Sequence, residues 1–358
     1  MSDVSLEADE SRRFATDLLR AWGTPEGAAA EVADHLVLAD LSGHASHGIS
    51  RLPWYRRYVN EGVVQPAQIP SIENTDLTRH GVAVVSANWG FSQPAGNLAT
   101  ELAVERALLN GVGAAAVVRC AHMGRMGTYV ERAAAAGCAA IATVGGMRGA
   151  GVTVPFGGAK PLLGPSPYSM GFPTMTDSPV LMDISTTEIP LGKVMIAKSA
   201  GRRLPVAGLV EADGSLTDDP SALDRGGALA TFGGHKGFGL ATMADLFGGT
   251  LTGAFEYASE GFGGPAFRSA GMLVIAVAAD AFAPSSAVTH RASQLQAEIR
   301  DVPPAAGVTA VLAPGDPEAS ARQSAKGRIA IPEALWNEIV ELAIHGEVTP
   351  PETREVVA

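Results

Sequence analysis

The chain has 358 residues, of which 46% are hydrophobic and 18% charged, a composition typical of globular proteins and not of disordered ones. Its length predicts about two domains. A net charge of -11 argues against a nucleic-acid partner, because phosphate binding needs clustered lysine and arginine. It does not exclude an anionic substrate, because local basic residues outweigh distant charges once salt screens them.

The two cysteines, Cys120 and Cys138, exclude a disulfide framework and a thiolate metal cluster. No stretch approaches about 18 uninterrupted apolar residues, so no membrane span is predicted. The first ten residues are acidic and polar and lack the hydrophobic core of a signal peptide. Together these features predict a cytoplasmic protein that binds neither membranes nor nucleic acids.

The N-terminal region, residues 1–75, is predicted to be helical. A first apolar helix face ends at Gly23, Thr24 then supplies the N-cap of a second helix, and Pro53 begins a third. A proline-containing loop at 63–78 marks the end of this region.

From residue 81 onward, strands and helices alternate. Strands are expected at 82–86, 114–120, 139–144, 179–185, 271–277 and 309–312, and helices at 93–110, 128–136, 332–345 and from about Glu188. Asp213 and Gly214 predict a hairpin turn. The order predicts an α/β fold in which helices cover neighbouring strands of a mixed sheet. We expect residues 76–304 to bind cofactor and substrate, and residues 305–358 to pack back on 1–75.

A polar segment at 40–51 combines His47, Ser46 and Arg51 with a second imidazole, His44, and two glycines. Imidazoles exchange protons near neutral pH, and a guanidinium can bind a carboxylate through two hydrogen bonds. A reductase of small oxo acids needs these groups. The alternative interpretation of this segment is a capped helix end whose polar side chains are all satisfied.

A second imidazole, His122, follows an apolar strand and precedes Gly124, at the strand end where α/β proteins collect ligands. We expect it to converge with His47 and Arg51 in one cleft. Asp40 and His44 stand seven and three residues before His47, a helical spacing that would also suit a metal site.

A dinucleotide site usually shows the pattern G-x-G-x-x-G between a strand and a helix, and this chain lacks it there. The glycines at 145–151 follow a strand in the wrong order and do not begin a helix. Lys236, flanked by glycines ahead of a helix, is instead suited to a phosphate or ribose. Asp183, with Ser185 close behind it, could hold a ribose or an amide, or could cap the next helix.

These motifs, taken in order, resemble one family. The matching stretches are Asp40-x-x-Gly43-x-x-Ser46-His47-Gly48-x-x-Arg51, His122-x-Gly124, Leu163-Gly164 through Pro173, Asp183 before a hydroxyl cluster, Gly192-Lys193, Gly233-Gly234-x-Lys236-Gly237-x-Gly239-Leu240 and Pro314-Gly315. Over residues 10–345 the chain is similar to the malate/L-lactate dehydrogenase family, which has the sulfolactate dehydrogenase-like fold and is unrelated to the Rossmann lactate dehydrogenases.

The resemblance implies a homodimer that uses NAD or NADP to reduce 2-oxo acids or cyclic 2-imino acids, or to oxidise the products. It implies that His47 or His122 transfers the proton, and that Ser46 and Arg51 orient a small carboxylate substrate. The resemblance implies no metal. The cofactor-binding positions that it implies are Gly146, Asp183, Ile184, Ser185, His235 and Lys236.

Three stretches depart from the family pattern. Pro165-Ser166 replaces Thr-Asn, Gly145-Gly146 replaces Asn-Ser, and residues 185–187 are Ser-Thr-Thr where Ala-Thr-Ser is usual. Each hydrogen bond lost in a buried site costs about 1–3 kcal/mol. The alternatives are therefore a cyclic-imine reductase, a member whose nicotinamide chemistry is lost or repurposed, and a metal-dependent lyase or hydrolase using Asp40, His44 and His47.

Overall fold

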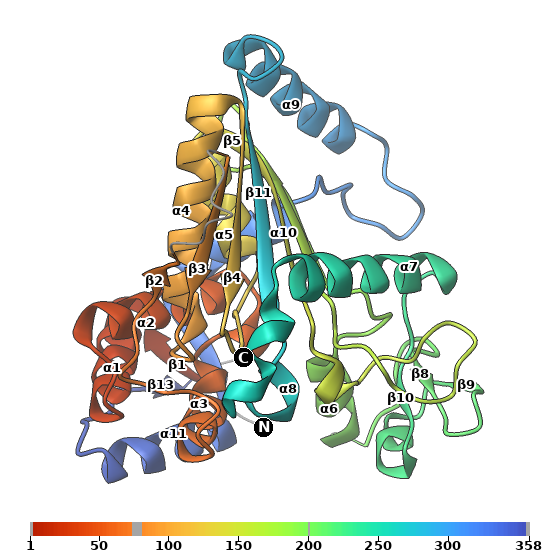
Figure 1. The fold of residues 1–358 in the computed structure, drawn as a ribbon. Helices are drawn as coiled ribbons and strands as arrows, with labels where there is room; N and C mark the ends of the chain where they lie inside the picture. The colour runs from red at the N-terminus through yellow and green to blue at the C-terminus, as the bar shows by residue number, and fades with distance from the viewer. Residues whose placement is uncertain (1–2, 74–80, 200, 356–358) are drawn as a thin grey trace.

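The computed structural model describes residues 3–73, 81–199 and 201–355 and has a mixed α/β architecture (Figure 1). Its helices are α1 (Ala8–Ala21), α2 (Glu26–Leu41), α3 (Leu52–Asn60), α4 (Ser92–Asn110), α5 (Gly127–Ala135), α6 (Leu191–Ser199), α7 (His235–Ala244), α8 (Gly264–Phe267), α9 (Ser285–Arg300), α10 (Asp316–Ala325) and α11 (Glu333–His345). A π-helical segment, η5 (Asp245–Leu251), continues α7.

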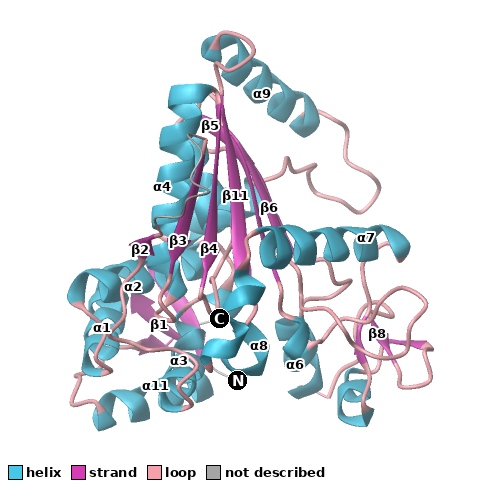
Figure 2. Ribbon diagram, viewed as in Figure 1, coloured by secondary structure: helices cyan, strands magenta, loops and turns pink. Residues whose placement is uncertain are grey.

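The main sheet has the strand order β2-β3-β4-β11-β5-β6-β7 (Figure 2). Its strands are β2 (Ser71–Ile72), β3 (Val82–Ser86), β4 (Val112–Val118), β5 (Cys138–Gly145), β6 (Tyr168–Phe172), β7 (Val180–Ile184) and β11 (Gly271–Ala278). Strand β11 lies antiparallel between β4 and β5, so these two strands are not neighbours as the sequence order suggested. The strand at 271–277 fits there because its alternate residues are buried and its neighbours half-buried.

Four strands that run in the same direction end at the same edge of the sheet. The pairs that define this edge are Ser86 with Val118, Met272 with both Val117 and Val144, and Tyr168 with both Thr143 and Ile184. The segments that follow β3, β4, β5 and β7 therefore leave the sheet side by side. This edge collects the residues after Val118, after Gly145 and around Asp183, as expected for a ligand-binding edge.

One face of the sheet is covered by α4 and α5 (Figure 1). Helix α4 presents a stripe of alanines at intervals of four residues, Ala95, Ala99, Ala103 and Ala107, all fully buried. Small side chains let the helix lie close to β4, where a side chain on Gly113 would come within 2.2 Å of the Ala103 carbonyl oxygen. Helix and strand are in backbone contact here.

The ends of the chain meet in a second sheet. Strand β1 (Asp3–Glu7) pairs antiparallel with β12 (Arg328–Pro332) and with β13 (Arg354–Glu355). The N-terminal region is thus not purely helical, because residues 3–7 form a strand. Leu6 and Ile331 belong to the same core as α1 and α11, so the two ends of the chain are packed together.

The predicted hairpin at Asp213-Gly214 is confirmed: β8 (Leu209–Val210) pairs with β9 (Leu216–Thr217), and β10 (Ala228–Leu229) completes this small sheet. Three local predictions are wrong. Residues 309–312 form no strand. Helix α6 begins at Leu191 rather than near Glu188. Thr24 makes no hydrogen bond that caps α2. Its hydroxyl is buried without a partner because Pro25 has the N-cap position.

Both cysteines, Cys120 and Cys138, are buried free thiols. Within the ranges that the structure describes, no helix is both long and apolar enough to cross a lipid bilayer.

Replacing Gly113 by alanine is expected to separate α4 from β4. The added methyl would overlap the Ala103 carbonyl and the Ala107 nitrogen, and overpacking of this kind costs about 1–3 kcal/mol of unfolding free energy. The control is Gly27→Ala in the first turn of α2, where an added methyl meets nothing within 4 Å. That variant should be as stable as the parent or slightly more stable. Urea unfolding of both variants measures the difference; equal stabilities would contradict the packing.

Candidate active site

The two imidazoles that the sequence singled out lie face to face. The ring centroids of His47 and His122 are 5.5 Å apart and the ring planes differ by 19°. His47 lies in a short 3-10 turn, Ala45–His47, that follows α2, and His122 lies in the loop that follows β4. The expected convergence of the two segments is therefore present within one copy of the chain.

The segment before His47 does not continue helix α2. The helix ends at Leu41, and Gly43 adopts φ +80°. Asp40 points back to accept a hydrogen bond from the backbone N–H of Ile49 at 2.8 Å, and Gly48 leaves room for it, since a Cβ there would lie 1.8 Å from Asp40 Oδ1. Burial raises the pKa of Asp40 to about 7. Asp40 thus closes the turn that carries His47.

His44 turns toward the C-terminal part of the chain, where its Nε2 lies 3.3 Å from Glu318 Oε1. Asp40, His44 and His47 therefore have three different sets of neighbours. Among the described residues, no group of three or more histidine, cysteine, aspartate or glutamate side chains is arranged to hold a metal ion. Because α2 ends at Leu41, Asp40, His44 and His47 do not lie on one helix face.

Arg51 and Ser46 lie beside His47. The Arg51 Nε donates a hydrogen bond to the Ser46 carbonyl oxygen at 2.5 Å, and the Ser46 hydroxyl lies 3.1 Å from His47 Nδ1. A Cβ on Gly192, near the start of α6, would lie 3.3 Å from the Ser46 Cβ. The segment that follows β7 therefore packs against the turn that carries His47.

Both imidazoles are held in the neutral form. Removal from water, with a further contribution from the positive charge of Arg51, lowers the pKa of His47 to about 3. The same two causes, in the same order, lower the pKa of His122. The resting site therefore has one cation next to two uncharged imidazole rings.

The loop that carries His122, residues 121–127, is held by side chains from four other elements. The bonds are Ser92 Oγ to the Ala121 N–H, Gln93 Nε2 to the His122 carbonyl, Tyr129 hydroxyl to the Met123 carbonyl, His35 Nε2 to the Arg125 N–H, and Asp183 Oδ2 to the Gly127 N–H. They span 2.6–3.4 Å. Residues 121–125 have no regular structure, and these five bonds give backbone groups of the buried segment the partners that they need inside the molecule.

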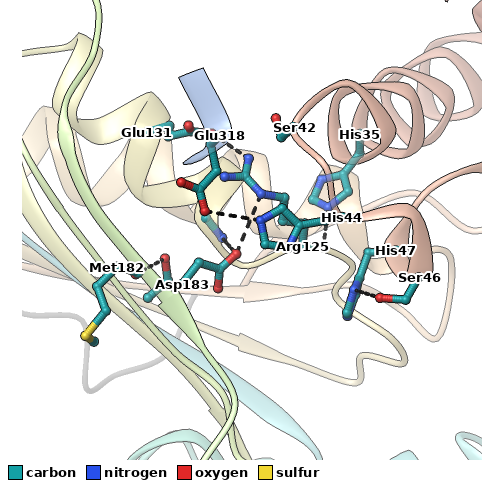
Figure 3. A network of polar contacts seen from close by, with 12 residues as sticks. His35, Ser42, His44, Ser46, His47, Arg125, Glu131, Met182, Asp183 and Glu318 are labelled. Carbon is teal, nitrogen blue, oxygen red and sulfur yellow. Dashed lines mark hydrogen bonds and ion pairs between the residues drawn. The ribbon is translucent and has the colours of Figure 1, made fainter. Parts of the chain in front are cut away.

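Asp183 belongs to an ion-pair network around Arg125 (Figure 3). The Arg125 side chain is 1% exposed; its Nη1 lies 2.6 Å from Glu131 and its Nε 3.7 Å from Asp183. Arg322 of α10 binds the other oxygen of Glu131 at 3.0 Å. Burial raises the pKa of Asp183, while the charge of Arg125 acts in the opposite direction. The carboxylate at the end of β7 is thus tied to the His122 loop.

Ile184 and Ser185 follow Asp183 at the ligand-binding edge, and both are half-buried. The next residues pair with the segment before α7, since the Phe232 N–H donates to the Thr186 carbonyl at 3.1 Å. This pairing brings Ser185 near the segment that leads to His235 and Lys236, both of which are exposed in the first turn of α7. These four candidate cofactor residues come from two adjacent segments.

Gly146 lies elsewhere on this edge. Its N–H donates to Asp245 Oδ1 at 3.0 Å, and it lines a cavity of about 340 Å³ that includes Arg148 and Arg268 but neither histidine. Gly145 and Gly146 are in backbone contact with Gly248 and Gly249 of η5. A Cβ at 145 would lie 2.1 Å from the Ala244 carbonyl oxygen, and one at 146 would lie 1.9 Å from the Ser269 carbonyl oxygen, so neither position has space for a side chain.

The departure at Pro165-Ser166 is visible in the backbone conformation. Ser166 is buried and adopts φ +44°, a left-handed conformation that asparagine tolerates better than serine. The preceding residue, Pro165, accepts hydrogen bonds through its carbonyl from both the N–H and the hydroxyl of Thr186. The backbone that supports Ser185 is therefore held in place without the amide expected at 166.

Sequence reasoning missed the residues that position His122. Tyr55 on α3 lies 3.0 Å from His122 Nδ1, and Gln93 on α4 donates to the Tyr55 oxygen at 2.6 Å. One signal was present: Gln93 and Asn97 interrupt an otherwise small or apolar buried face of α4. A second signal was the position of Tyr55 four residues after Arg51, a helical spacing that places two side chains near each other.

Fold and site together define an enzyme class with a mixed sheet, no glycine-rich dinucleotide turn, and paired imidazoles beside an arginine. Residues 6–340 match the family model described as malate/L-lactate dehydrogenase. The L-lactate dehydrogenase of Cupriavidus necator is 32% identical over 97% of this chain and 99% of that protein. The chain therefore belongs to the malate/L-lactate dehydrogenase family and is an oxidoreductase.

Two further relatives carry different names. The Delta(1)-pyrroline-2-carboxylate/Delta(1)-piperideine-2-carboxylate reductase of Pseudomonas syringae pathovar tomato is 34% identical over 92% of this chain and 94% of that protein. The solved structure of sulfolactate dehydrogenase from Methanocaldococcus jannaschii superimposes with a TM-score of 0.83 at 29% identity, covering 96% of this chain and 98% of that one. The fold is thus that of the sulfolactate and malate dehydrogenases, as predicted, and the family includes both dehydrogenases and reductases.

The buried His35 makes the stability of the fold depend on pH. Burial, with a smaller contribution from Arg125, lowers its pKa from 6.5 to about 3. Between these values the unfolded chain binds a proton that the folded chain refuses, so stability falls as the pH falls. His35→Gln should reduce this slope by up to about 1.4 kcal/mol per pH unit. Urea unfolding at several pH values within this window gives the slope.

The control for this measurement is His345→Gln, which removes an exposed imidazole at the end of α11. It should leave the slope of the parent protein unchanged. Parallel curves for the parent and His35→Gln would show that His35 is not held neutral.

Proposed function

We propose that this protein transfers a hydride between a nicotinamide nucleotide and C2 of a small 2-oxo or 2-hydroxy carboxylate. The observation that carries the proposal is the stacked pair His47 and His122 beside the guanidinium of Arg51. The family adds support, because its named members include dehydrogenases and reductases of small carboxylates. A second candidate substrate class is the cyclic 2-imino acids, favoured by the 34% identity to a pyrroline and piperideine carboxylate reductase.

Arg51 is suited to bind the substrate carboxylate. Its Nε is engaged by the Ser46 carbonyl, whereas its two terminal nitrogens have no hydrogen bond or ion pair to any residue in the described ranges. A guanidinium with two free N–H groups binds a carboxylate in a planar, two-bond arrangement. This arrangement would fix the face of C2 and place the C2 oxygen or nitrogen near the imidazoles.

The proton for the C2 oxygen or nitrogen would come from His47 or His122. Both are neutral in the resting site, in part because Arg51 repels a second positive charge. A carboxylate bound to Arg51 would cancel part of this repulsion and raise the pKa of both imidazoles. The proton donor would therefore form when the substrate binds, which couples protonation to the presence of a carboxylate.

The nucleotide, when bound, supplies the hydride; the chain would hold it through residues at the end of β7 and at the start of α7. Asp183 contacts the segment that carries His122 through the Gly127 N–H, and Ile184 and Ser185 follow it directly. Lys236 offers a charge that has no ion-pair partner among described residues. His235 lies beside Lys236 and against the ring of Phe156. Gly237, in the first turn of α7, lets the preceding segment approach closely, since a Cβ there would lie 2.3 Å from the Phe232 carbonyl oxygen.

Gly146 would contribute to nucleotide binding only through the cavity that it lines, because its N–H already binds Asp245. The altered residues at 145–146 and 165–166 motivate the remaining alternative, a member with lost or repurposed nicotinamide chemistry. Titration of the protein with NADH and with NADPH, monitored by the quenching of tryptophan fluorescence, distinguishes the proposed function from this alternative. Failure of both nucleotides to bind would contradict the proposed function.

The substrate class is tested by a screen of 2-oxo acids and cyclic 2-imino acids with both reduced nucleotides, followed at the nicotinamide absorbance. Turnover of 2-oxo acids would support the first candidate, and turnover of cyclic imines alone would support the second. Binding of a nucleotide without turnover of any carboxylate would contradict both.

Arg51→Lys should raise KM for the carboxylate substrate by about 10–100-fold, because lysine cannot make the planar two-bond contact. The affinity for the nucleotide should not change. The control is Arg57→Lys on the neighbouring helix α3, because Arg57 is exposed and pairs with Glu61. This variant should have the KM of the parent. Equal KM values for the parent and Arg51→Lys, measured by initial rates, would remove Arg51 from the substrate site.

We further propose that two copies of the chain associate through the sheet face that α4 and α5 leave uncovered. The register aligns Ile275, Ile141, Met170 and Met182 in one row across β11, β5, β6 and β7. Ile141 lies on a central strand and yet is 43% exposed. A continuous apolar surface of this kind is characteristic of a protein interface. The homodimer implied by the family resemblance would bury it.

Ile141→Glu should convert the dimer to a monomer, because it places a charge at the centre of the proposed interface. Sedimentation velocity measures the mass of the parent and of the variant. The control is Leu109→Glu at the end of α4, since Leu109 is 75% exposed but lies away from this face. A monomeric parent, or a dimeric Ile141→Glu variant, would contradict the interface.

A further inference from the structure

A buried line of hydrogen bonds leads from helix α4 to His122. The amide nitrogen of Gln93 donates to the Tyr55 oxygen at 2.6 Å, and the Tyr55 hydroxyl lies 3.0 Å from His122 Nδ1. Gln93 is fully buried and Tyr55 is 2% exposed. Three side chains from three different segments thus form one chain of donors and acceptors, in which Gln93 and Tyr55 are closed to solvent and His122 is half-buried.

The direction of this chain follows from the Gln93 amide. The Gln93 Nε2 also lies 3.4 Å from the His122 carbonyl oxygen, which can only accept a hydrogen bond. An amide oxygen in that place would face another oxygen, so the group there is the NH₂. Gln93 therefore donates to the Tyr55 oxygen, and the single proton of the Tyr55 hydroxyl is left for His122 Nδ1.

The protonation state of His122 follows in turn. Burial raises the pKa of Tyr55, so its hydroxyl keeps its proton, and burial lowers the pKa of His122, so the ring is neutral. A neutral imidazole that accepts at Nδ1 carries its proton on Nε2. Nε2 makes no hydrogen bond to any residue of the described ranges, so it is the nitrogen available to a ligand.

We propose that Gln93 and Tyr55 are positioning residues that hold His122 as its Nε2–H tautomer, so that a substrate meets a hydrogen-bond donor. The inference rests on the proposed function for the identity of that substrate. A donor at this point matches the oxygen of a 2-oxo acid or the ring nitrogen of a cyclic 2-imino acid, each of which accepts a hydrogen bond.

The direct test is the tautomer itself, read by long-range ¹H–¹⁵N correlation NMR of the full chain with ¹⁵N-labelled histidine and no ligand. His122→Gln assigns the signals by their disappearance. The expected pattern is an unprotonated Nδ1 and a protonated Nε2 for His122. A protonated Nδ1, or an even mixture of the two tautomers, would overturn the proposal.

Two variants test the roles of the positioning residues. Tyr55→Phe removes the donor and should release His122 into a mixture of tautomers. Gln93→Glu puts an acceptor where the donor stood, so the Tyr55 hydroxyl should turn to it and the His122 proton should move to Nδ1. A His122 spectrum unchanged in both variants would overturn the proposal. If Gln93→Glu does not fold, Tyr55→Phe alone decides.

The matched control is Tyr58→Phe, one turn further along α3, whose hydroxyl makes no hydrogen bond to another described residue. It should leave the His122 spectrum unchanged. With a substrate identified, Tyr55→Phe should lower kcat for reduction about tenfold without changing nucleotide affinity. Because the spectrum needs no substrate, a failure of the proposed function and a failure of the tautomer assignment give different results.

Discussion

The site depends on one constraint, which is that the buried loop 121–127 must find hydrogen bonds for its backbone inside the molecule. Helix and sheet ladders cannot supply them, because the loop is irregular. Side chains from α2, α4, α5 and β7 supply them instead. The five bonds bring these four elements toward the end of β4, so satisfying the loop also assembles the site. His35 and Asp183 therefore hold in place the segment that carries His122.

The sequence was informative where structure is determined locally. Strand β3 has the predicted bounds, and α4, α5, β5 and β11 lie within two residues of theirs, because side-chain periodicity is a local property. The motifs around His47 and His122 were recognisable for the same reason, since glycines and polar residues interrupted apolar runs. Strand-end topology placed only His122 where ligands collect. Its convergence with His47 was a separate hypothesis, and the stacked rings agree with it.

Non-local features were not accessible to the same reasoning. The place of β11 between β4 and β5 depends on pairing across more than a hundred residues, and β6, α9 and α10 carried too weak a pattern to identify. Thr24 has the right residue type for a cap, but the position belongs to Pro25. Gln93 and Tyr55 looked like ordinary buried positions on two helices, because their role appears only when both meet His122.

The contact between Gly145-Gly146 and Gly248-Gly249 also constrains how this protein can change. A Cβ at any of the four positions would meet backbone atoms at 1.9–2.5 Å. A side chain at 145 would meet the backbone of Ala244 and Asp245, and one at 146 would meet the Ser269 carbonyl oxygen. Side chains at these two positions would therefore require both the start of η5 and the segment before β11 to shift. The glycines thus couple the end of β5 to two segments that lie far from it along the chain.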